Sequence, residues 1–400
     1  MMKNKPDIRF DGFNDAWELR KVSEMFIVTR GQVLAATETS EKQTSEMTYP
    51  VYSSQTKNNG LMGYYKDYLF DTAITWTTDG ANAGTVNYRE GKFYSTNVNG
   101  VLLSSDGFVN KAIAEILGQE SWKWVSHVGN PKLMNNVMSE ISITIPSSLK
   151  EQNRLSDFLT IIDNIITLHQ RELENYKLLK KGFLQKLFPS NGDTNPSIRF
   201  DGFTDAWEQR ELSEIATMNA RIGWQNLRTS EFLDSGDYML ITGTDFNDGV
   251  VDFSSIHYVD KERYDQDKKI QIRDESILIT KDGTLGKVAY IQGLSMPATL
   301  NAGVFNVRVK DNVKVDSKYL FHYLNAPFLL KFADEQSTGG TIKHLNKNVL
   351  VKFPVPLPCV EEQIKIATLF SDLDNLITLH QRELDNYKEF KKGFLQKMFV

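Results

Sequence analysis

The sequence predicts an α+β protein in which two mixed α/β globular domains are joined by two long, repeated helices packed as an antiparallel coiled coil, with pseudo-two-fold symmetry. Two internal repeats carry this prediction. Residues 6–25 return as 196–215 with 14 of 20 positions identical, and residues 164–188 return as 375–399 with 20 of 25 identical. We call the first repeat (6–25 and 196–215) the box, the second repeat (164–188 and 375–399) the helix, and the unlike sequence between them the insert. The chain therefore has the order box, insert, helix, and then the same three parts again.

The repeated helices are predicted to be long and continuous. The first copy has no proline between Glu151 and Phe188, and Pro189 ends it. Large side chains recur in steps of three and four, as at the a and d positions of a coiled coil. These positions are Leu159, Ile162, Ile166, His169, Leu173, Tyr176, Lys180, Phe183 and Leu187, and then Phe370, Leu373, Ile377, His380, Leu384, Tyr387, Lys391, Phe394 and Met398. At about 1.5 Å per residue, one helix is roughly 57 Å long.

Four polar residues interrupt this predicted apolar seam. His169 and His380 are interpreted as residues that fix helix register or pairing, with a metal-binding or catalytic role as the alternative. Lys180 and Lys391 are expected to extend their ammonium groups from the seam into solvent. The charged stretch "HQRELENYK" is typical of a solvated helix face, and it equally suits contact with a partner protein.

The two inserts differ in sequence but share their predicted elements. Each has an Asp-Gly turn between β-rich runs, at 73–88 and 277–291, which predicts a β-hairpin. Each ends with a strand that leads into proline, in "EISITIPSS" and "VKFPVPLP". These features favour a mixed α/β domain in each insert.

A helix is predicted after each hairpin, at 104–119 and at 316–333. Side chains that cap helix N-termini precede both. The predicted N-caps are Ser104 or Ser105 for the first helix and Asp316 or Ser317 for the second.

Six segments follow from this order of elements. They are 1–25 as the N-terminal box, 26–148 as the first globular domain, 149–189 as the central long helix, 190–215 as the linker and second box, 216–358 as the second globular domain, and 359–400 as the C-terminal long helix.

Composition places the chain among ordinary globular proteins, with 400 residues, 40% hydrophobic and 24% charged. The single cysteine, Cys359, excludes an internal disulfide and a cysteine-based zinc site. The opening "MMKNKPDIRF" lacks the apolar core of a secretory signal, and no apolar stretch approaches the roughly 20 residues of a membrane span. We therefore expect a soluble, cytoplasmic protein without a membrane partner.

Charge is the main obstacle to a nucleic-acid hypothesis. The net charge is −5, with 9 basic and 11 acidic residues in 26–145 and 17 of each in 216–355. Proteins that bind DNA through its phosphates usually carry a basic excess. A DNA-binding role therefore requires local clusters of positive charge, or partner subunits that supply phosphate contacts.

No catalytic constellation is found in the sequence. G-x-S-x-G, H-E-x-x-H and G-x-G-x-x-G are absent, and "GTLGKV" is not a phosphate-binding loop of the Walker type. The histidines outside the seam lack metal-ligand spacing. Asp79 with "EGK" at 90–92 has the form of a nuclease D…E-x-K arrangement, but one such match is expected by chance. We expect a non-catalytic binding protein without a metal, and a hydrolase or nuclease is the alternative.

Several quoted segments occur together and in a fixed order. They are the twin "RFDGF.DAWE" boxes, "YPVYSSQTKNNG" in the first insert, "ITKDGTLGKV" in the second, the exit "HLNKNVLVKFPVPLPCVEEQ" and the twin "HQREL.NYK..KKGFLQK.F" helices. In this combination the sequence resembles the specificity (S) subunit of type I restriction–modification systems along nearly its whole length. The resemblance implies that each insert is a target recognition domain that reads one half of a bipartite, asymmetric site in double-stranded DNA.

The resemblance also implies partners and cofactors. The helices would set the spacer between the half-sites, and the repeated frame would dock two modification (methyltransferase) subunits. Restriction (motor-nuclease) subunits would join for cleavage. This chain would hold no cofactor, whereas S-adenosylmethionine, ATP and Mg would belong to the partner subunits. The absence of an N-P-P-[FY] or D-P-P-[FY] tetrapeptide here agrees with that division.

Candidate DNA-contacting residues lie in the polar loops and hairpins of the inserts. Ser, Thr, Asn, Gln and Lys side chains read base edges in the major groove, although exposed turns contain the same residues without function. The candidates are Ser53, Gln55, Lys57, Asn58, Thr78, Asn82 and Lys132 in the first domain, and Thr242, Thr244, Asn247, Lys281, Thr284, Lys287, Lys343, His344 and Asn346 in the second. The competing hypothesis is a coiled-coil scaffold that joins two partners without reading DNA.

Overall fold

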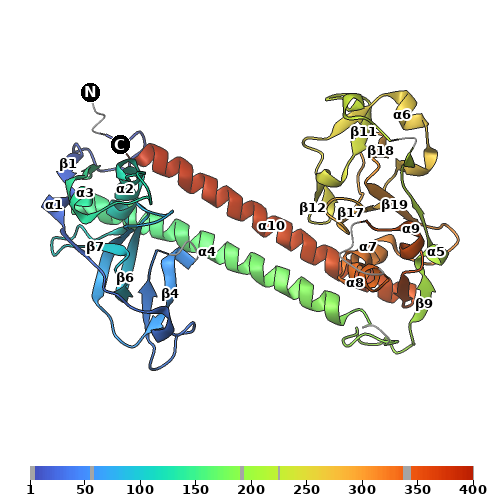
Figure 1. The fold of residues 1–400 in the computed structure, drawn as a ribbon, viewed down its shortest axis with the longest axis horizontal. Coiled ribbons are helices and arrows are strands. Elements are labelled where there is room, and N and C mark those ends of the chain that lie inside the picture. The colour runs from blue at the N-terminus through green and yellow to red at the C-terminus, as the bar shows by residue number, and fades with distance from the viewer. Residues whose placement is uncertain (1–4, 55–57, 190–192, 224–225, 337–343, 400) are drawn as a thin grey trace. The chain divides into compact units, whose positions relative to one another are not determined.

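The chain forms two compact units, which contain residues Met1–Arg171 with Gln381–Val400, and Glu172–His380. The computed structural model describes residues 5–54, 58–189, 193–223, 226–336 and 344–399. Each unit combines a mixed α/β domain with parts of two long helices, as the sequence predicts (Figure 1).

The two long helices are α4 (Leu149–Lys186) and α10 (Val360–Met398). They correspond to the predicted helices at 149–189 and 359–400. Neither helix nor any other in the described ranges is long and apolar enough to cross a membrane.

Within each unit the two long helices pack antiparallel. In the first unit the ring centroids of Phe158 and Phe394 are 4.8 Å apart, and those of His169 and Tyr387 are 5.2 Å apart. Residue numbers increase along α4 from the first pair to the second and decrease along α10, so the two helices run in opposite directions. In the second unit Lys180 forms an ion pair with Asp374. The antiparallel packing confirms the predicted pairing direction.

The polar seam residues are held by partners inside their own unit. His169 Nδ1 lies 3.3 Å from a Glu383 carboxylate oxygen, and His380 Nδ1 lies 3.4 Å from one of Glu172. His380 stacks on Tyr176 at 5.2 Å, so each histidine packs against an aromatic ring of the facing helix. The two lysines differ from expectation, because each is mostly buried in an ion pair with an aspartate instead of reaching into solvent.

The first unit is built on a six-stranded sheet of order β2-β7-β5-β6-β3-β4. The predicted hairpin at 73–88 is confirmed as β5 and β6, which pair antiparallel with Ile74 opposite Tyr88. The elements are β1 (Glu18–Lys21), α1 (Val22–Met25), β2 (Ile27–Arg30), β3 (Tyr49–Tyr52), β4 (Leu61–Tyr65), β5 (Phe70–Thr77), β6 (Val86–Ser95), β7 (Asn99–Leu103), α2 (Lys111–Ser121), α3 (Asn135–Glu140) and β8 (Ser142–Ile145).

The predicted start of the first short helix is wrong. Helix α2 begins at Lys111 and is capped by Asn110, whose side chain accepts a hydrogen bond of 3.0 Å from the Ile113 amide. Ser104 instead accepts a hydrogen bond from the Asp106 amide in a turn. Gly107 at φ +86° ends that turn in a conformation that a helix does not allow.

The second unit contains two four-stranded sheets, of order β10-β19-β16-β17 and β14-β11-β18-β15. The predicted hairpin at 277–291 is confirmed as β16 and β17. The elements are β9 (Glu208–Glu211), α5 (Leu212–Ile215), β10 (Ala216–Asn219), β11 (Tyr238–Ile241), β12 (Phe246–Asn247), β13 (Val250–Val251), β14 (His257–Val259), α6 (Lys261–Asp265), β15 (Gln271–Ile272), β16 (Ile277–Thr280), β17 (Val288–Tyr290), β18 (Ala298–Leu300), β19 (Val304–Val309), α7 (Ser317–Asn325), α8 (Phe328–Glu335), α9 (Lys347–Leu350) and β20 (Pro354–Leu357).

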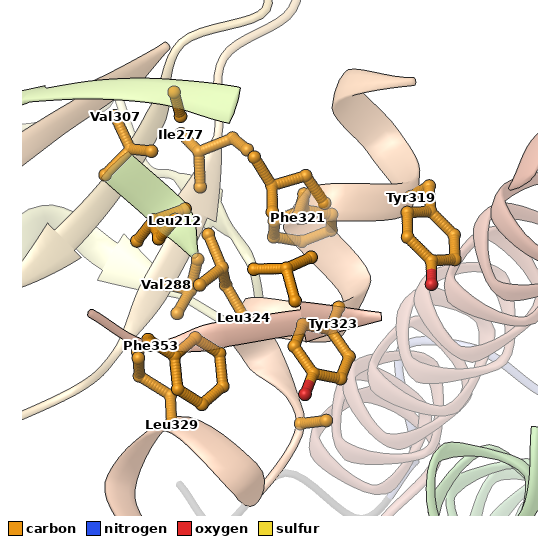
Figure 2. Packing of buried hydrophobic residues seen from close by; sticks show 14 of the residues in the cluster. Leu212, Ile277, Val288, Val307, Tyr319, Phe321, Tyr323, Leu324, Leu329 and Phe353 are labelled. Atoms are coloured by element: carbon orange, nitrogen blue, oxygen red, sulfur yellow. The ribbon is translucent and has the colours of Figure 1, made fainter. Parts of the chain in front are cut away.

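The core of the second unit lies between α7 and the first of these sheets. Figure 2 shows Phe321 and Leu324 of α7 near the strand residues Ile277 and Val288, and all four belong to one buried cluster. The hydroxyl of Tyr323 reaches out of this cluster to donate a 3.0 Å hydrogen bond to the Pro354 carbonyl. Helix α7 therefore packs its apolar side against β16 and β17, and it is hydrogen-bonded to β20, the last strand of the domain.

The single helix predicted at 316–333 is two helices. The cap is as predicted, because Asp316 accepts a 2.8 Å hydrogen bond from the Tyr319 amide. Helix α7 ends at Asn325 and α8 begins after Pro327, since proline has no amide hydrogen to continue the helical bonding.

The two boxes sit in matching surroundings in their respective units. Strand β1 of the first box pairs with β8, and β9 of the second box pairs with β20. The predicted strands before the prolines are thereby confirmed. The Ile8 amide donates to the Lys397 carbonyl at 3.0 Å, and the Ile198 amide donates to Lys186 in the same way at 3.0 Å. Each box thus holds both the end of its insert and the end of a long helix.

Candidate nucleic-acid interface

Three candidate segments of the first unit meet around the turn between β5 and β6. The Gly80 amide donates to the Pro131 carbonyl at 3.0 Å, and the Leu133 amide donates to the Thr78 carbonyl at 2.8 Å. The Asn82 side chain donates to the Ser54 carbonyl at 3.3 Å. The loop after β3, the hairpin turn and the segment around Lys132 therefore form one surface.

The candidate residues of this surface differ in accessibility. Asn58 is exposed, and so is Lys132, whose ammonium group lies 3.7 Å from the Asp79 carboxylate. Ser53 is half-buried and accepts a 3.1 Å hydrogen bond from Thr96. Thr78 is buried, and its hydroxyl hydrogen is shared between the Asp79 carboxylate and the Val98 carbonyl, each 2.9 Å away, so it supports the turn from inside. Gln55 and Lys57 lie outside the described residues.

A polar cavity of about 140 Å³ opens beside this surface. Ser53 and Asn82 line it together with Arg89 of β6, which the sequence reasoning missed. Burial lowers the pKa of the Arg89 guanidinium, and the nearby Tyr52 side chain partly offsets this effect. The sequence does show Arg89 as a charged residue within a run of strand-forming residues. The alternation along a strand does not show which face of the sheet other parts of the chain will cover, so the burial of Arg89 could not be predicted.

A larger cavity, of about 670 Å³, lies in the second unit and is lined by three candidate residues. Lys281 lies at the end of β16, with its ammonium group 5.6 Å from the centre of the Phe305 ring. His344 Nδ1 lies 2.6 Å from a carboxylate oxygen of Asp282. Asn346 caps α9 by accepting a 3.1 Å hydrogen bond from the Asn348 amide. The structure thus brings together candidates that are more than 60 positions apart in the sequence; Lys343 lies outside the described residues.

Positive charge gathers in the lining of this second cavity. Its basic residues are Arg221, Lys269, Lys281 and Lys347, and its carboxylates are Asp267 and Asp282. Arg221 is buried and donates to the Leu300 carbonyl at 2.8 Å and to Thr299 at 3.4 Å. Basic residues of this lining therefore outnumber its carboxylates by four to two, an excess that the domain as a whole lacks.

The remaining candidates of the second unit lie on two turns and on the short strand β12. Thr242 is buried, and its amide and hydroxyl donate to Asp245 at 2.7 and 3.0 Å, so it shapes a turn whose Thr244 is exposed. Asn247 is exposed on β12. Thr284 and Lys287 are exposed on the β16–β17 turn. The Thr280 hydroxyl accepts from the Lys287 amide at 3.0 Å, which fixes that turn.

A repeated frame that carries two unlike domains, each with a polar and positively charged concavity, defines a protein with two recognition domains. The family model of the type I restriction modification DNA specificity domain matches residues 14–177 and again 204–387. The chain therefore belongs to the family of type I restriction–modification specificity subunits.

Relatives of the same description match most of the chain. The type I restriction enzyme MjaVIII specificity subunit of Methanocaldococcus jannaschii is 22% identical over 96% of this chain and 92% of its own length. A putative type I specificity subunit of Mycoplasma pneumoniae is 28% identical over 81% of both chains. The crystal structure of an S subunit from M. genitalium covers 99% of both chains with a TM-score of 0.71 at 17% identity, which supports the fold.

Proposed function

We propose that each of the two domains reads one half of a bipartite, asymmetric DNA site. The observation that carries this proposal is the pairing of one repeated frame with two different sets of exposed polar and basic side chains. The first set surrounds the β5–β6 turn, and the second lines the cavity at Lys281 and His344. Different side chains on equivalent frames suit two different base sequences.

The repeated frame serves identical partners in this proposal. Box and helix are nearly the same in both halves of the sequence, so they present the same surface twice. Two modification subunits would dock on these surfaces, and restriction subunits would join for cleavage. S-adenosylmethionine, ATP and Mg would be bound by those partners, and this chain would be non-catalytic. The long helices would set the spacer between half-sites, since half-sites on one face of DNA lie about 34 Å apart.

The test is to express this chain with its modification subunit in a host without adenine methylation and to sequence the modified positions. We expect a single bipartite motif. Exchange of residues 26–145 for the corresponding insert of another system should change one half of that motif and leave the other half and the spacer unchanged.

Two results would contradict the proposal. A stable complex that adds no adenine methylation would favour the scaffold hypothesis, in which the chain joins two partners without reading DNA. Metal-dependent cleavage of DNA by the purified chain alone would show a catalytic function that the proposal excludes.

A further inference from the structure

Arg89 is a charged residue enclosed in the first unit. Only 7% of it is exposed. Its Nε donates to the Thr75 hydroxyl at 3.3 Å, and its Nη2 donates to the Asn59 carbonyl at 2.5 Å. The guanidinium carbon lies 3.7 Å from the centre of the Tyr52 ring. These contacts hold the side chain in one place through neutral groups.

No carboxylate of the described residues forms an ion pair with Arg89. The stretches that the structure leaves undescribed contain no Asp or Glu, so they offer none either. Burial lowers the pKa of the Arg89 guanidinium, and the neighbouring Tyr52 side chain partly offsets this shift. A buried charge without a counter-ion is strongly unfavourable, which makes it a candidate for binding an external anion.

The cavity next to Arg89 suits a small anion. Its volume of about 140 Å³ is roughly ten times the 10–15 Å³ that one water molecule requires. Hydroxyl and amide groups of Ser53, Asn82 and Asn87 line it, and none of its described lining residues is acidic.

We propose that Arg89 and this cavity bind one phosphate group of the DNA backbone when the first domain engages its half-site. This inference rests on the proposed function, because it requires the first unit to contact DNA. Arginine binds phosphate through two parallel N–H groups, and neutral amides and hydroxyls supply the remaining hydrogen bonds. The phosphate would provide the counter-ion that the protein does not.

A phosphate fits this cavity better than a base does. A base edge within duplex DNA remains stacked in the groove, whereas the phosphates protrude from the helix. Two candidate base-reading residues, Ser53 and Asn82, line the cavity itself, so a phosphate bound there would fix the register of the domain on DNA. Arg89 would thus position the domain without contributing to sequence choice.

The first experiment compares DNA affinity over a range of salt concentrations for the complex of the full chain with its modification subunit. For Arg89→Gln we expect a slope of log K against log salt that is smaller by about 0.9, the value for one lost phosphate contact. The affinity loss should be equal for duplexes with and without the recognised motif. Arg89→Lys should retain most of the slope, and Lys66→Gln removes one exposed positive charge outside the cavity as a charge-matched control.

A second experiment identifies the phosphate. An uncharged methylphosphonate is placed at one linkage at a time in the half-site that the first domain reads. We expect one linkage at which the wild-type affinity falls to that of Arg89→Gln, while Arg89→Gln itself loses nothing further. The thermal stability of the wild type in inorganic phosphate, compared with chloride at equal ionic strength, tests whether a free anion also fills the cavity. If phosphate stabilises the wild type but no methylphosphonate linkage lowers its affinity in this way, the assignment of the site to a DNA phosphate is overturned.

A variant that supplies an internal counter-ion guards against simple misfolding. Asn87 lies two residues before Arg89 on the same face of β6 and lines the cavity. Asn87→Asp should raise thermal stability and reduce the salt slope in the same way as Arg89→Gln. Unchanged DNA binding in both Asn87→Asp and Arg89→Gln would overturn this inference and leave the proposed function standing. A change in the base sequence that Arg89→Gln accepts would also overturn it, because a phosphate contact does not select bases. A wild-type complex that ignores the bipartite motif would instead overturn the proposed function.

Discussion

Arg9 donates two parallel hydrogen bonds to Glu151, from Nε to Oε1 at 2.6 Å and from Nη2 to Oε2 at 2.7 Å. Glu151 is 1% exposed and also accepts from the Trp17 indole at 3.3 Å. The second unit repeats the pair, since Arg199 donates to Glu362 with both distances at 2.8 Å. In each unit this ion pair connects the box to the first turn of a long helix. Because box and helix contact each other directly, they are repeated together.

Replacement of Glu151 by glutamine should destabilise the first unit. The substitution removes a charge that lies against Arg9 in a mostly buried site, and loss of one partner of a buried ion pair costs about 3 kcal/mol of unfolding free energy. Arg9 retains some access to water, with 14% of its side chain exposed, so we expect the lower part of the usual range. Urea unfolding of the full chain, with amide hydrogen exchange to assign the unit, measures the change.

The matched control is Glu18→Gln. Glu18 pairs with Arg20 at 3.0 Å, but both side chains are about two-fifths exposed. Such surface pairs contribute about 0–1 kcal/mol. Equal losses in Glu18→Gln and Glu151→Gln would mean that burial does not strengthen the pair between box and helix.

The frame of the protein was predictable because its signals are local and repeated. The spacing of Leu159, Ile162 and Leu173 predicts a buried helix face, and these residues are 2%, 4% and 5% exposed. The Asp-Gly turns predict both hairpins, since few residues other than glycine adopt the backbone angles that such turns require. The antiparallel pairing of the helices followed from the pseudo-symmetry together with the order of box and helix in the sequence.

The candidate site was predictable only in outline because it depends on contacts distant in sequence. Thr78 and Thr242 have the right chemistry for reading DNA, but the Val98 carbonyl and Asp245 occupy their hydroxyl groups. Arg89 was missed because its burial depends on Asn59, 30 positions away. Turn signals locate the loops, whereas tertiary packing decides which of their side chains remain available.

His322 should make the second unit sensitive to acid. It is 1% exposed on α7, and burial, with Lys180 and Lys318 nearby, lowers its pKa from 6.5 to about 3. A lowered pKa means that the neutral form stabilises the fold above pH 6.5, and that this stability is lost as the pH falls toward 3. At pH 4.5 the loss is at most about 2.7 kcal/mol, because two pH units correspond to that energy.

Comparison with His322→Phe isolates this effect. The replacement keeps an aromatic ring against Phe370, which lies 5.2 Å away. Asp374 also faces this site, and burial raises its pKa despite the contact with Lys180. The contribution of Asp374 to the free energy of unfolding therefore falls as the pH rises. Asp374 is present in both proteins, and we expect the difference in unfolding free energy between them to change from pH 7 to pH 4.5. A difference independent of pH would show that His322 does not titrate in this range.

Two glycines should respond to alanine in opposite ways. A Cβ atom at Gly100 would lie 2.1 Å from the ring of Trp76, which is 1% exposed and cannot move aside. Gly100→Ala should therefore destabilise the first unit by about 2–3 kcal/mol, the cost of overpacking a core. Gly182 lies within α4, and no atom of the described residues comes within 4 Å of its Cβ position, so Gly182→Ala should stabilise the helix by about 0.5–1 kcal/mol. Thermal unfolding of both variants checks the contrast; a stable Gly100→Ala protein would mean that the Trp76 site can rearrange.

Lys287 and Lys281 should affect the second half-site and leave the first unchanged. Lys287 is exposed on the β16–β17 turn, and Lys281 lines the cavity of the same unit. Loss of a side chain that contacts a base costs about 1–3 kcal/mol of discrimination at one position, whereas loss of a phosphate contact weakens binding to all sequences. Methylation motifs and affinities of the two alanine variants, each in complex with the modification subunit, separate these roles. Lys261→Ala is the control, because Lys261 is exposed and paired with Asp265 on α6. A Lys287→Ala complex with unchanged motif and affinity would remove Lys287 from the interface, and a change in the first half-site would contradict the assignment of one domain to each half.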